Sequence, residues 1–483
     1  MTKKEIFEKS APTIHCYASR GMRVLFLMVI ITSVFSSCKK ESFITSPDAS
    51  LYTSADTLSF DTVFVTSGSV TQSFKIFNNN DQKLRLSQVK LAGGVSSPFK
   101  MNVDGTPTSE IDNVEINSND SLYVFVQVNV NPTADLLPFI VSDSIRIDYN
   151  GNTKWVQLQA YGQNAVFLKN EKLTGNVNWN NTLPYVILGG IQVDTNATLN
   201  ISAGAKIFLH ATAPFLVDGT LKVNGTKDAP VVFSGDRLDP DYEDLPASWP
   251  GIFFRNTSEN NLLKHAIIQN AYQGIIAQNL STTSNPKVNL SQCVLNNIYD
   301  AGILAINTTI YSDNSLISNC GSNIQLEYGG DYRFVNCTVA SYGFNYLIHK
   351  NPVLQISNSI SQDGSIYTAP LNGFFQNCIF WGDGGTVDDE ITTDRQGTDP
   401  FSVTFDHVLY KAKNDISNAT FISPIKNEPP LFDSIDVSNN IFDFHFNNHP
   451  EAPAVNAGIA TPFVYDLDDK PRDAMPDIGC YER

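Results

Sequence analysis

Basic side chains are scarce in this chain of 483 residues. It contains 32 Lys and Arg against 49 Asp and Glu, so its formal net charge at pH 7 is −17. A surface of this sign repels phosphate backbones, which bind to clustered Lys and Arg. The composition therefore excludes nucleic acid as a class of partner, and the length predicts two or more domains, or one domain plus a solenoid.

The chain is also poor in histidine and lacks several enzyme motifs. Of the 7 His, His265, His349 and His407 are isolated, and His445 and His449 lie in a segment rich in Phe and Asn that does not predict a helix. None has the spacing of a metal site. The chain contains no Gly-Xaa-Ser-Xaa-Gly elbow and no phosphate-binding loop, so it lacks these marks of serine hydrolases and nucleotide-binding enzymes.

The N-terminus has a single short apolar run, residues 24–31, which follows Met22-Arg23 and precedes Ser36-Ser37-Cys38. A membrane-spanning helix is the alternative, but it needs roughly 20 apolar residues. The pattern therefore predicts an export signal over residues 1–37, with Met22 as the better start codon. The sequence around Cys38 resembles the lipoprotein signals of Bacteroidetes. This resemblance implies lipid attachment at Cys38, a tether over residues 38–54 and anchoring in the outer membrane. It leaves both the periplasmic and the cell-surface side as alternatives.

Five cysteines remain after Cys38. An odd number excludes a complete set of intramolecular disulfides in an oxidising compartment. We predict that they are buried thiols acting as small apolar side chains, with disulfides as the alternative. They are Cys293, Cys320, Cys337, Cys378 and Cys480.

Residues 55–165 have the pattern of short antiparallel strands. Alternating runs at 70–77, 84–91, 122–130, 144–149 and 154–160 are separated by turn residues such as Asn150-Gly151-Asn152. This predicts a β-sandwich. The stretches 74–78 and 120–126 resemble the immunoglobulin-like modules of envelope proteins, which implies a spacing, capping or binding role, and we identify no chemistry there.

A four-residue pattern recurs downstream at Gln292, Asn314, Asn336, Asn358 and Asn377, at steps of 22, 22, 22 and 19 residues. A second pattern starts at Gly251, Gly274, Gly302 and Asn323, and a third relates residues 198–201 to 220–223. Short apolar runs at this period predict a right-handed parallel β-helix in which equivalent positions stack from rung to rung. The predicted fold class is therefore all-β, a sandwich followed by a solenoid.

The phrases at 199–207 and 219–233 resemble right-handed β-helix proteins of the pectate-lyase-like superfamily. The resemblance implies a solenoid over residues 166–450. Residues 451–483 resemble the closing motif of secreted bacterial β-helix proteins, which implies a cap that folds over the last rung. We expect Asp466, Asp468, Arg472 and Glu482 to form ion pairs within this cap rather than a site.

Enzymes with this fold act on acidic polysaccharides as hydrolases or lyases. The hydrolase pattern is represented here only by Asp388-Asp389, in a predicted loop. A lyase needs a basic side chain, for which Arg237, Arg255 and Arg333 are candidates, and often Ca²⁺. The densest group of possible Ca²⁺ ligands comprises Asp236, Asp239, Asp241, Glu243 and Asp244, with a solvated loop as the alternative.

Aromatic side chains near the rung corners are candidate sugar-stacking residues. The alternative is that they fill the corners or the core. They are Tyr328, Tyr332, Tyr342, Phe344, Tyr346 and Trp381.

The sequence thus predicts a lipid-anchored envelope protein with a non-catalytic binding or scaffolding surface for glycans, polysaccharides or envelope proteins. The alternative is a polysaccharide lyase or glycoside hydrolase acting on acidic glycans. No cofactor is predicted apart from the candidate Ca²⁺ cluster.

Overall fold

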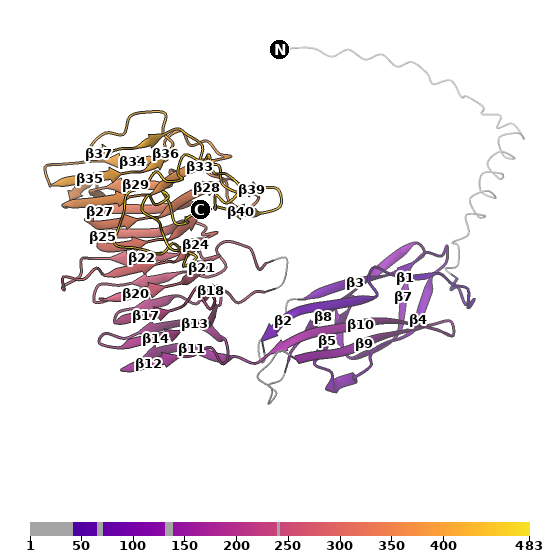
Figure 1. The fold of residues 1–483 in the computed structure, drawn as a ribbon. Helices are drawn as coiled ribbons and strands as arrows, with labels where there is room; N and C mark the ends of the chain where they lie inside the picture. Colours follow the sequence, from indigo (N-terminus) through magenta and orange to yellow (C-terminus); the bar gives the residue numbers. More distant parts are fainter. Residues whose placement is uncertain (1–41, 65–70, 131–138, 239–241) are drawn as a thin grey trace, which may run out of the picture.

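The computed structural model describes residues 42–483 except 65–70, 131–138 and 239–241. It confirms the predicted fold class: an antiparallel β-sandwich is followed by a parallel β-helix (Figure 1). In the described part, helix is limited to one 3₁₀ turn, Gly94–Ser96. No helix there has the length and apolar character needed to cross a membrane.

The sandwich has two five-stranded sheets. The inward positions of its strands are aliphatic, as in β8, where Leu122, Val124 and Val126 are buried between polar or aromatic outward neighbours. The first sheet has the order β1 (Leu51–Thr53), β3 (Gln72–Asn78), β8 (Asp120–Val128), β5 (Phe99–Val103) and β6 (Thr106–Thr108). The second has the order β2 (Thr57–Phe64), β10 (Asn152–Gln163), β9 (Phe139–Tyr149), β4 (Leu84–Leu91) and β7 (Glu110–Ile116).

The sandwich begins earlier than predicted. Strand β1 lies within the stretch expected as a tether and pairs with β3. Upstream of it, the Ile44 N–H donates to the Lys83 carbonyl at 2.8 Å, and the Asn150 side chain donates to the Ile44 carbonyl at 3.0 Å. The polar composition of residues 42–54 did not predict that this segment packs on the sandwich. The hydrogen bonds that hold the segment use mainly its backbone groups, which every sequence has.

The solenoid is built from parallel strands in three stacks, each strand pairing with its equivalent in the next rung. The first stack contains β11 (Val166–Leu173), β13 (Tyr185–Val193), β15 (Lys206–Leu209), β18 (Val231–Gly235), β21 (Ala266–Gln269), β24 (Val294–Asn296), β26 (Leu316–Ser318), β28 (Thr338–Tyr342), β33 (Ile379–Asp383), β36 (Leu409–Tyr410) and β38 (Ile425–Lys426).

The second stack continues from the ends of β11 and β13 and uses the first halves of the two long strands β25 and β27. Its members are β16 (Phe215–Val217), β19 (Ile252–Phe254), β22 (Ile275–Gln278), β25 (Ala301–Asp313), β27 (Ser322–Val335), β29 (Leu354–Ser357) and β34 (Ile391–Asp394).

The third stack uses the second halves of β25 and β27. The other members are β12 (Asn176–Trp179), β14 (Thr198–Ser202), β17 (Thr220–Asn224), β20 (Asn261–Lys264), β23 (Val288–Ser291), β32 (Leu371–Gln376), β35 (Phe401–Asp406) and β37 (Thr420–Ile422). Two hairpins lie outside the stacks, β30 (Ser359–Gln362) with β31 (Ser365–Thr368), and β39 (Ser434–Asp436) with β40 (Ile441–Asp443).

The predicted registers hold with one exception. Ile252, Ile275, Ile303 and Ile324 pair in succession, as the glycine pattern predicted. Asn358 does not lie in the amide ladder: the strand that follows Asn336 pairs with the strand that follows Asn377. The prediction was wrong there because the four-residue pattern at Asn358 does not begin a new rung at this corner. The chain between Asn336 and Asn377 instead contains β29 and the hairpin β30–β31.

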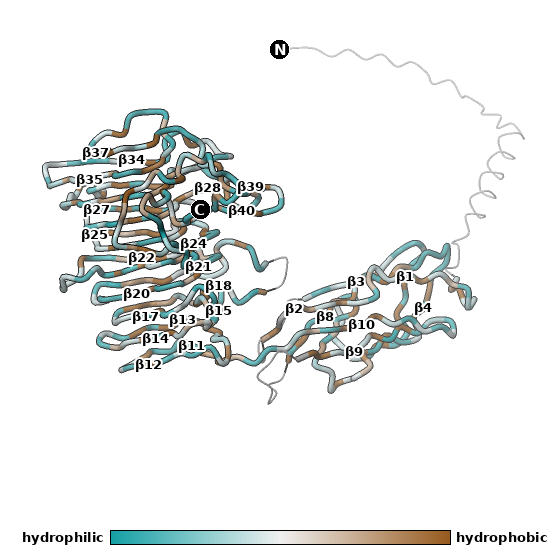
Figure 2. The backbone as a smooth tube through the Cα atoms, viewed as in Figure 1, coloured by the Kyte–Doolittle hydropathy of each residue, from teal (hydrophilic) through white to brown (hydrophobic). Residues whose placement is uncertain are grey.

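The interior of the solenoid contains a column of aligned side chains. The rings of Phe334, Phe375, Phe405 and Phe421 stack in sequence with centroid separations of 5.6, 4.9 and 4.8 Å and interplanar angles of 13–16°. Figure 2 shows hydrophobic and hydrophilic residues alternating along the strands. The inward face of each rung is therefore buried against the neighbouring rungs, as expected for a solenoid.

One corner of the solenoid is a ladder of residues in the left-handed conformation. Each backbone N–H donates to the carbonyl just before the equivalent residue of the next rung, as in Asn314 to Val335 and Asn336 to Gln376. Asn tolerates a positive φ better than most residues, which accounts for its repetition here. We call these residues the corner ladder: His265, Gln292, Asn314, Asn336, Asn377 and His407, with φ of 44–54°.

Residues 451–483, here called the C-terminal strap, lie along the corner ladder instead of over the last rung. Asn377 donates to the Ile459 carbonyl at 2.7 Å, and the Arg472 guanidinium donates to Asn314 Oδ1 at 3.0 and 3.1 Å. Gln292, one rung before Asn314, donates to the Asp466 carbonyl. The predicted position of the closing motif was therefore wrong, because these contacts join residues 82 to 174 positions apart.

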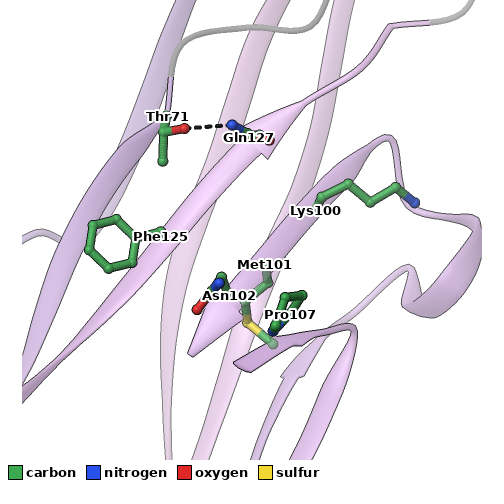
Figure 3. Close-up of a pocket in the computed structure, with 7 residues that line it drawn as sticks. All are labelled: Thr71, Lys100, Met101, Asn102, Pro107, Phe125 and Gln127. Atoms are coloured by element: carbon green, nitrogen blue, oxygen red, sulfur yellow. Dashed lines mark hydrogen bonds between the residues drawn. The ribbon is translucent and has the colours of Figure 1, made fainter. Parts of the chain in front are cut away.

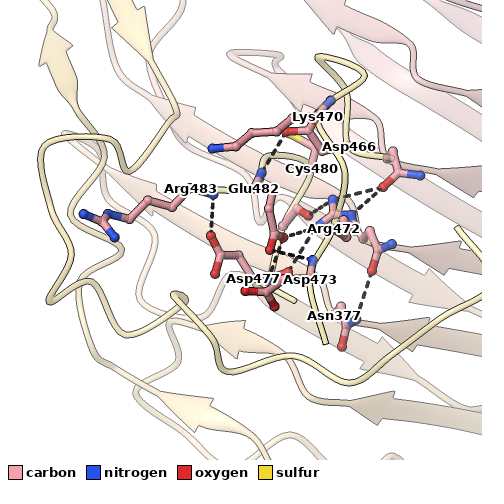
Figure 4. A network of polar contacts seen from close by, with 12 residues as sticks. Asn377, Asp466, Lys470, Arg472, Asp473, Asp477, Cys480, Glu482 and Arg483 are labelled. Carbon is pink, nitrogen blue, oxygen red and sulfur yellow. Dashed lines mark hydrogen bonds and ion pairs between the residues drawn. The ribbon is translucent and has the colours of Figure 1, made fainter. Parts of the chain in front are cut away.

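Arg472 is the buried centre of the strap (Figure 4). It forms the expected ion pair with Glu482 at 3.2 Å, with both side chains no more than 5% exposed. Asp466 instead accepts backbone N–H groups of Asp468, Lys470 and Glu482, which closes a turn. Burial raises the pKa of Glu482 despite the nearby Arg472.

The sandwich and the solenoid meet through a small apolar cluster. Phe64 of β2 lies 5.1 Å from Phe208 of β15, centroid to centroid, and both pack with the buried Val186. This contact lies at the end of the sandwich where β10 leads into β11, opposite the end where the described chain begins (Figure 1). It gives the junction a defined packing, in addition to the covalent link.

Candidate functional site

The predicted Ca²⁺ cluster is only partly described, since Asp239 and Asp241 lie outside the described residues. Asp236 is hydrogen-bonded to His210 Nδ1 at 2.8 Å, and burial raises the pKa of its carboxyl group. The carbonyls of Glu243 and Asp244 accept hydrogen bonds from the amides of Asn270 and Asn297, which hold the loop against the solenoid. The described residues contain no group of three His, Cys, Asp or Glu that could hold a metal, so this site stays a prediction.

Four of the candidate sugar-stacking aromatics are buried, including Phe344, which is 8% exposed. Tyr332 is fully buried in the solenoid core, where its hydroxyl donates to the Gly329 carbonyl at 2.8 Å. Tyr342 and Trp381 are 9% and 8% exposed beneath the strap and the β39–β40 hairpin. Their positions fit the alternative that these rings fill corners and core.

The remaining candidates are more accessible. Tyr328 takes a left-handed corner position with φ of 57° and is half-buried. Tyr346 is 49% exposed and meets the buried Phe344 edge to face at 6.1 Å. A sugar-binding role for these two tyrosines stays a prediction.

The candidate catalytic side chains are separated and each has a local partner. Asp388 pairs with Lys413 at 3.0 Å, and Asp389 accepts two hydrogen bonds from Asn414, which lower its pKa. The hydrogen bond between Arg255 Nε and Asp218 is 2.8 Å long. Each of these three charged side chains therefore has a hydrogen-bonding or ion-pair partner within the protein.

The other two arginines lie over aromatic rings. Arg237 lies 3.4 Å from the Tyr242 ring centroid, and Arg333 lies 5.9 Å from that of Phe374. The structure thus brings none of the three candidate arginines next to another. A basic side chain that removes a proton also needs a substrate group held beside it, and these contacts do not define such a place.

The five described cysteines are free and buried, as predicted. Cys293 donates to the Leu263 carbonyl, and burial raises its pKa to about 12. A thiol with such a pKa stays protonated at neutral pH and is unreactive. The burial of all five thiols, none of them in a disulfide, agrees with a packing role.

The outward face of the first sandwich sheet carries a group of exposed rings that the sequence did not single out. Tyr123 and Phe125 of β8 are 42% and 38% exposed and stack at 5.5 Å with an angle of 12°. On the adjacent strands, Lys75 lies over the Tyr123 ring at 4.6 Å, and Phe77 meets the exposed Tyr52 at 5.7 Å. We call Tyr52, Phe77, Tyr123 and Phe125 the aromatic stripe.

A hollow of about 340 Å³ adjoins the stripe at Phe125 (Figure 3). Strand pairing places Asn102 beside Phe125 and Lys100 beside Gln127. Gln127 donates to Thr71 at 2.6 Å across the opening, while Oδ1 of Asn102 is buried without a hydrogen-bond partner among the described residues. The hollow is lined by Thr71, Lys100, Met101, Asn102, Pro107, Phe125 and Gln127.

The alternation of β8 contained a signal for this surface. In Leu122-Tyr123-Val124-Phe125-Val126 the aliphatic residues face the core, which leaves both aromatic residues on the outside. Large exposed rings that are neighbours on one face are unusual in a soluble domain and mark binding surfaces. The alternating pattern predicted the strand. That its outward face is not covered by another element follows from the way the two sheets pack.

Comparisons with known proteins show only distant likeness. No family model and no curated protein matches the sequence. A family 123 glycoside hydrolase from Clostridium perfringens, described in connection with glycolipid glycan hydrolysis, is 11% identical, with a TM-score of 0.18, over 24% of this chain and 26% of that chain. A PapD-like domain of human CEP192 is 10% identical, with a TM-score of 0.17, over 26% of this chain and 92% of that chain. Scores this low carry no argument about function.

Proposed function

We propose that this protein is a non-catalytic, lipid-anchored glycan-binding protein of the cell envelope, and that the aromatic stripe is its binding surface. The observation that carries the proposal is the pair of parallel, exposed rings, Tyr123 and Phe125, beside a hollow with amide and ammonium groups. The face of an aromatic ring carries negative potential, which attracts the C–H groups on the apolar face of a sugar. Amide and ammonium groups can then bind its hydroxyls.

The stripe is supported by a rigid element. Tyr123 and Phe125 project from the middle strand of a five-stranded sheet whose inward side chains are buried. Sites on strands hold their side chains in fixed relation, which lowers the entropic cost of binding an extended ligand. An oligosaccharide lying across β1, β3, β8 and β5 would follow the stripe into the hollow.

The proposed anchor is Cys38, which lies outside the described residues. Folded structure begins by residue 44, so the chain between Cys38 and the sandwich is short. At roughly 3.3–3.6 Å per residue, six residues reach about 20 Å at most. The sandwich would then lie close to the lipid surface, with the solenoid at the opposite end of the sandwich as a scaffold that extends away from it.

The glycan proposal is tested by binding of envelope and plant glycan oligomers to the full chain in detergent. We expect Tyr123→Ala and Phe125→Ala each to lower affinity at least about fivefold, since stacked rings at a binding surface contribute about 1–3 kcal/mol. Trp155→Ala is the matched control, because Trp155 is 43% exposed on the other sheet. Equal affinity of all three variants and the wild type would contradict the proposal.

The same incubations test the hydrolase and lyase alternative. New reducing ends or unsaturated products, with or without added Ca²⁺, would show turnover. We expect neither, and turnover lost in a folded Asp239→Ala, Asp241→Ala double variant would assign catalysis to the loop at 236–244.

The anchor is tested by labelling cells with a fatty-acid analogue. The wild type should be labelled and Cys38→Ala should not, because Cys38 is the cysteine that follows the apolar signal run. Cys16→Ala is the control. Label retained in Cys38→Ala would contradict the anchor.

A further inference from the structure

The aromatic stripe is flanked by lysines on both sides of β8. Lys75 lies on β3 with its ammonium 4.6 Å from the Tyr123 centroid, and Lys100 lies on β5 and lines the hollow. Register places Lys75 opposite Tyr123 and Lys100 opposite Gln127. The two positive charges therefore lie on the same outward face as the rings.

These two lysines differ from the basic residues of the second sheet. There, Arg85 pairs with Glu115 at 2.9 Å, Lys90 with Glu110 at 2.8 Å, and Arg146 with Asp148 at 2.9 Å. Among the described residues, Lys75 and Lys100 have no carboxylate within 4.0 Å, and the stripe and the lining of the hollow include no Asp or Glu.

Such a face is unexpected in a chain with a net charge of −17. An exposed ammonium without a carboxylate partner is favourable for a bound anion, and low-dielectric walls of a hollow strengthen that attraction. Oδ1 of Asn102 adds an acceptor at the hollow that has no donor among the described residues, and a sugar hydroxyl would supply one.

We propose that the aromatic stripe and the hollow bind an anionic oligosaccharide, whose rings stack on Tyr123 and Phe125 and whose carboxylate or sulfate groups contact Lys75 and Lys100. This inference rests on the proposed glycan-binding function and adds its chemical class. Charge-assisted hydrogen bonds from lysine to such groups supply selectivity that ring stacking alone does not, because stacking ignores charge.

The test compares ligands that differ only in charge. Calorimetry on the full chain would measure affinity for homogalacturonan oligomers and for their methyl esters, and for sulfated galactan oligomers and their desulfated forms. We expect the charged member of at least one pair to bind about tenfold or more tightly, with affinity falling as salt rises. The pair that shows the larger ratio identifies carboxylate or sulfate as the recognised group.

Substitutions then assign the selectivity to the two lysines. Lys75→Gln and Lys100→Gln should each lower affinity for the charged ligand about three- to tenfold and leave affinity for the neutral ligand unchanged. Lys206→Gln, at an exposed position of β15 in the solenoid, is the control.

Two results would overturn the inference and spare the proposed function: equal binding of charged and neutral partners that still depends on Tyr123 and Phe125, or equally tight binding of polyglutamate, which would show attraction to any polyanion. Failure of every oligosaccharide to bind would overturn both proposals. The ligand comparison uses the wild type, so it stands even if a variant folds poorly.

Discussion

The phenylalanine column of the solenoid and the aromatic stripe of the sandwich use stacked rings in opposite ways. In the solenoid, Phe375 is fully buried between Phe334 and Phe405 in a column of parallel rings. In the sandwich, the parallel rings of Tyr123 and Phe125 lie on the outer face of a sheet. Ring stacking of similar geometry therefore fills the core in the column and leaves an accessible surface in the stripe.

For polar residues, it is the solenoid corner that buries them and the sandwich surface that exposes them. Most outward polar groups of the sandwich are exposed, whereas the corner ladder of the solenoid has several buried amides, among them Asn314, Asn336 and Asn377. The C-terminal strap covers them and supplies their hydrogen-bond partners. A buried amide without a partner is costly, so the solenoid corner depends on a segment from the far end of the chain.

The largest expected contrast is between core and stripe aromatics. Phe375→Ala should lower the free energy of unfolding of the solenoid by about 3–5 kcal/mol, because it leaves a cavity in the stacked column. Phe125→Ala should lower the free energy of unfolding of the sandwich by less than about 1 kcal/mol, because the ring is exposed. Chemical denaturation followed by circular dichroism measures both, and similar losses would refute the contrast.

A second contrast concerns ion pairs. Arg472→Met should destabilise the solenoid by about 3–5 kcal/mol, because it leaves the buried Glu482 without its cation. Arg146→Met breaks the exposed pair with Asp148 in the sandwich and should cost at most about 1 kcal/mol. The three buried Trp residues, Trp179, Trp249 and Trp381, all lie in the solenoid, so tryptophan fluorescence reports mainly its unfolding. An unchanged midpoint for Arg472→Met would contradict a stabilising role of the Arg472–Glu482 pair.

The third contrast separates backbone strain from ladder contacts. Asn377→Leu should cost about 2–4 kcal/mol, since it combines left-handed strain with loss of hydrogen bonds to Asn336 and Ile459. Asn440 has a similar φ of 56° at an exposed position, so Asn440→Leu should show the strain alone. Equal losses for the two variants would mean that the amide ladder adds nothing.

The smallest expected effect is a dependence on pH. Burial raises the pKa of Asp313 in the solenoid above the ordinary value of 3.8, while hydrogen bonds to Lys154 and Thr53 lower the pKa of Asp56 in the sandwich. Between its ordinary and raised pKa, folded Asp313 binds its proton more tightly than the unfolded chain does. Its contribution to stability therefore rises as the pH falls through that window.

Asp313→Asn should remove this gain. As the pH is lowered towards 4, the unfolding free energy of the wild type should increase relative to that of Asp313→Asn. Urea denaturation at a series of pH values measures this difference. Asp56→Asn should show the opposite trend, because stability contributed by a carboxylate of lowered pKa is lost on acidification. Parallel profiles for the two variants would contradict the assignment.

Local patterns in the sequence were enough to predict the fold class and much of the rung register. Leu199 stacks under Leu221, and Ile275 under Ile303, because a strand with alternating apolar residues can bury one face in only one register. The repeated Asn also marked the corner, since that residue tolerates a positive φ. These are local properties, and short stretches of sequence contain them.

Which faces of the sheets are covered depends instead on contacts between distant segments of the chain. The position of the strap depends on contacts such as Arg472 to Asn314, across 158 residues, which no local pattern specifies. The same holds for Asn358, whose local sequence matches the ladder while its strand belongs to a hairpin. Alternation places Tyr123 and Phe125 outward, but whether an outward ring meets another element or solvent depends on the packing of distant segments, and here that packing leaves the aromatic stripe open.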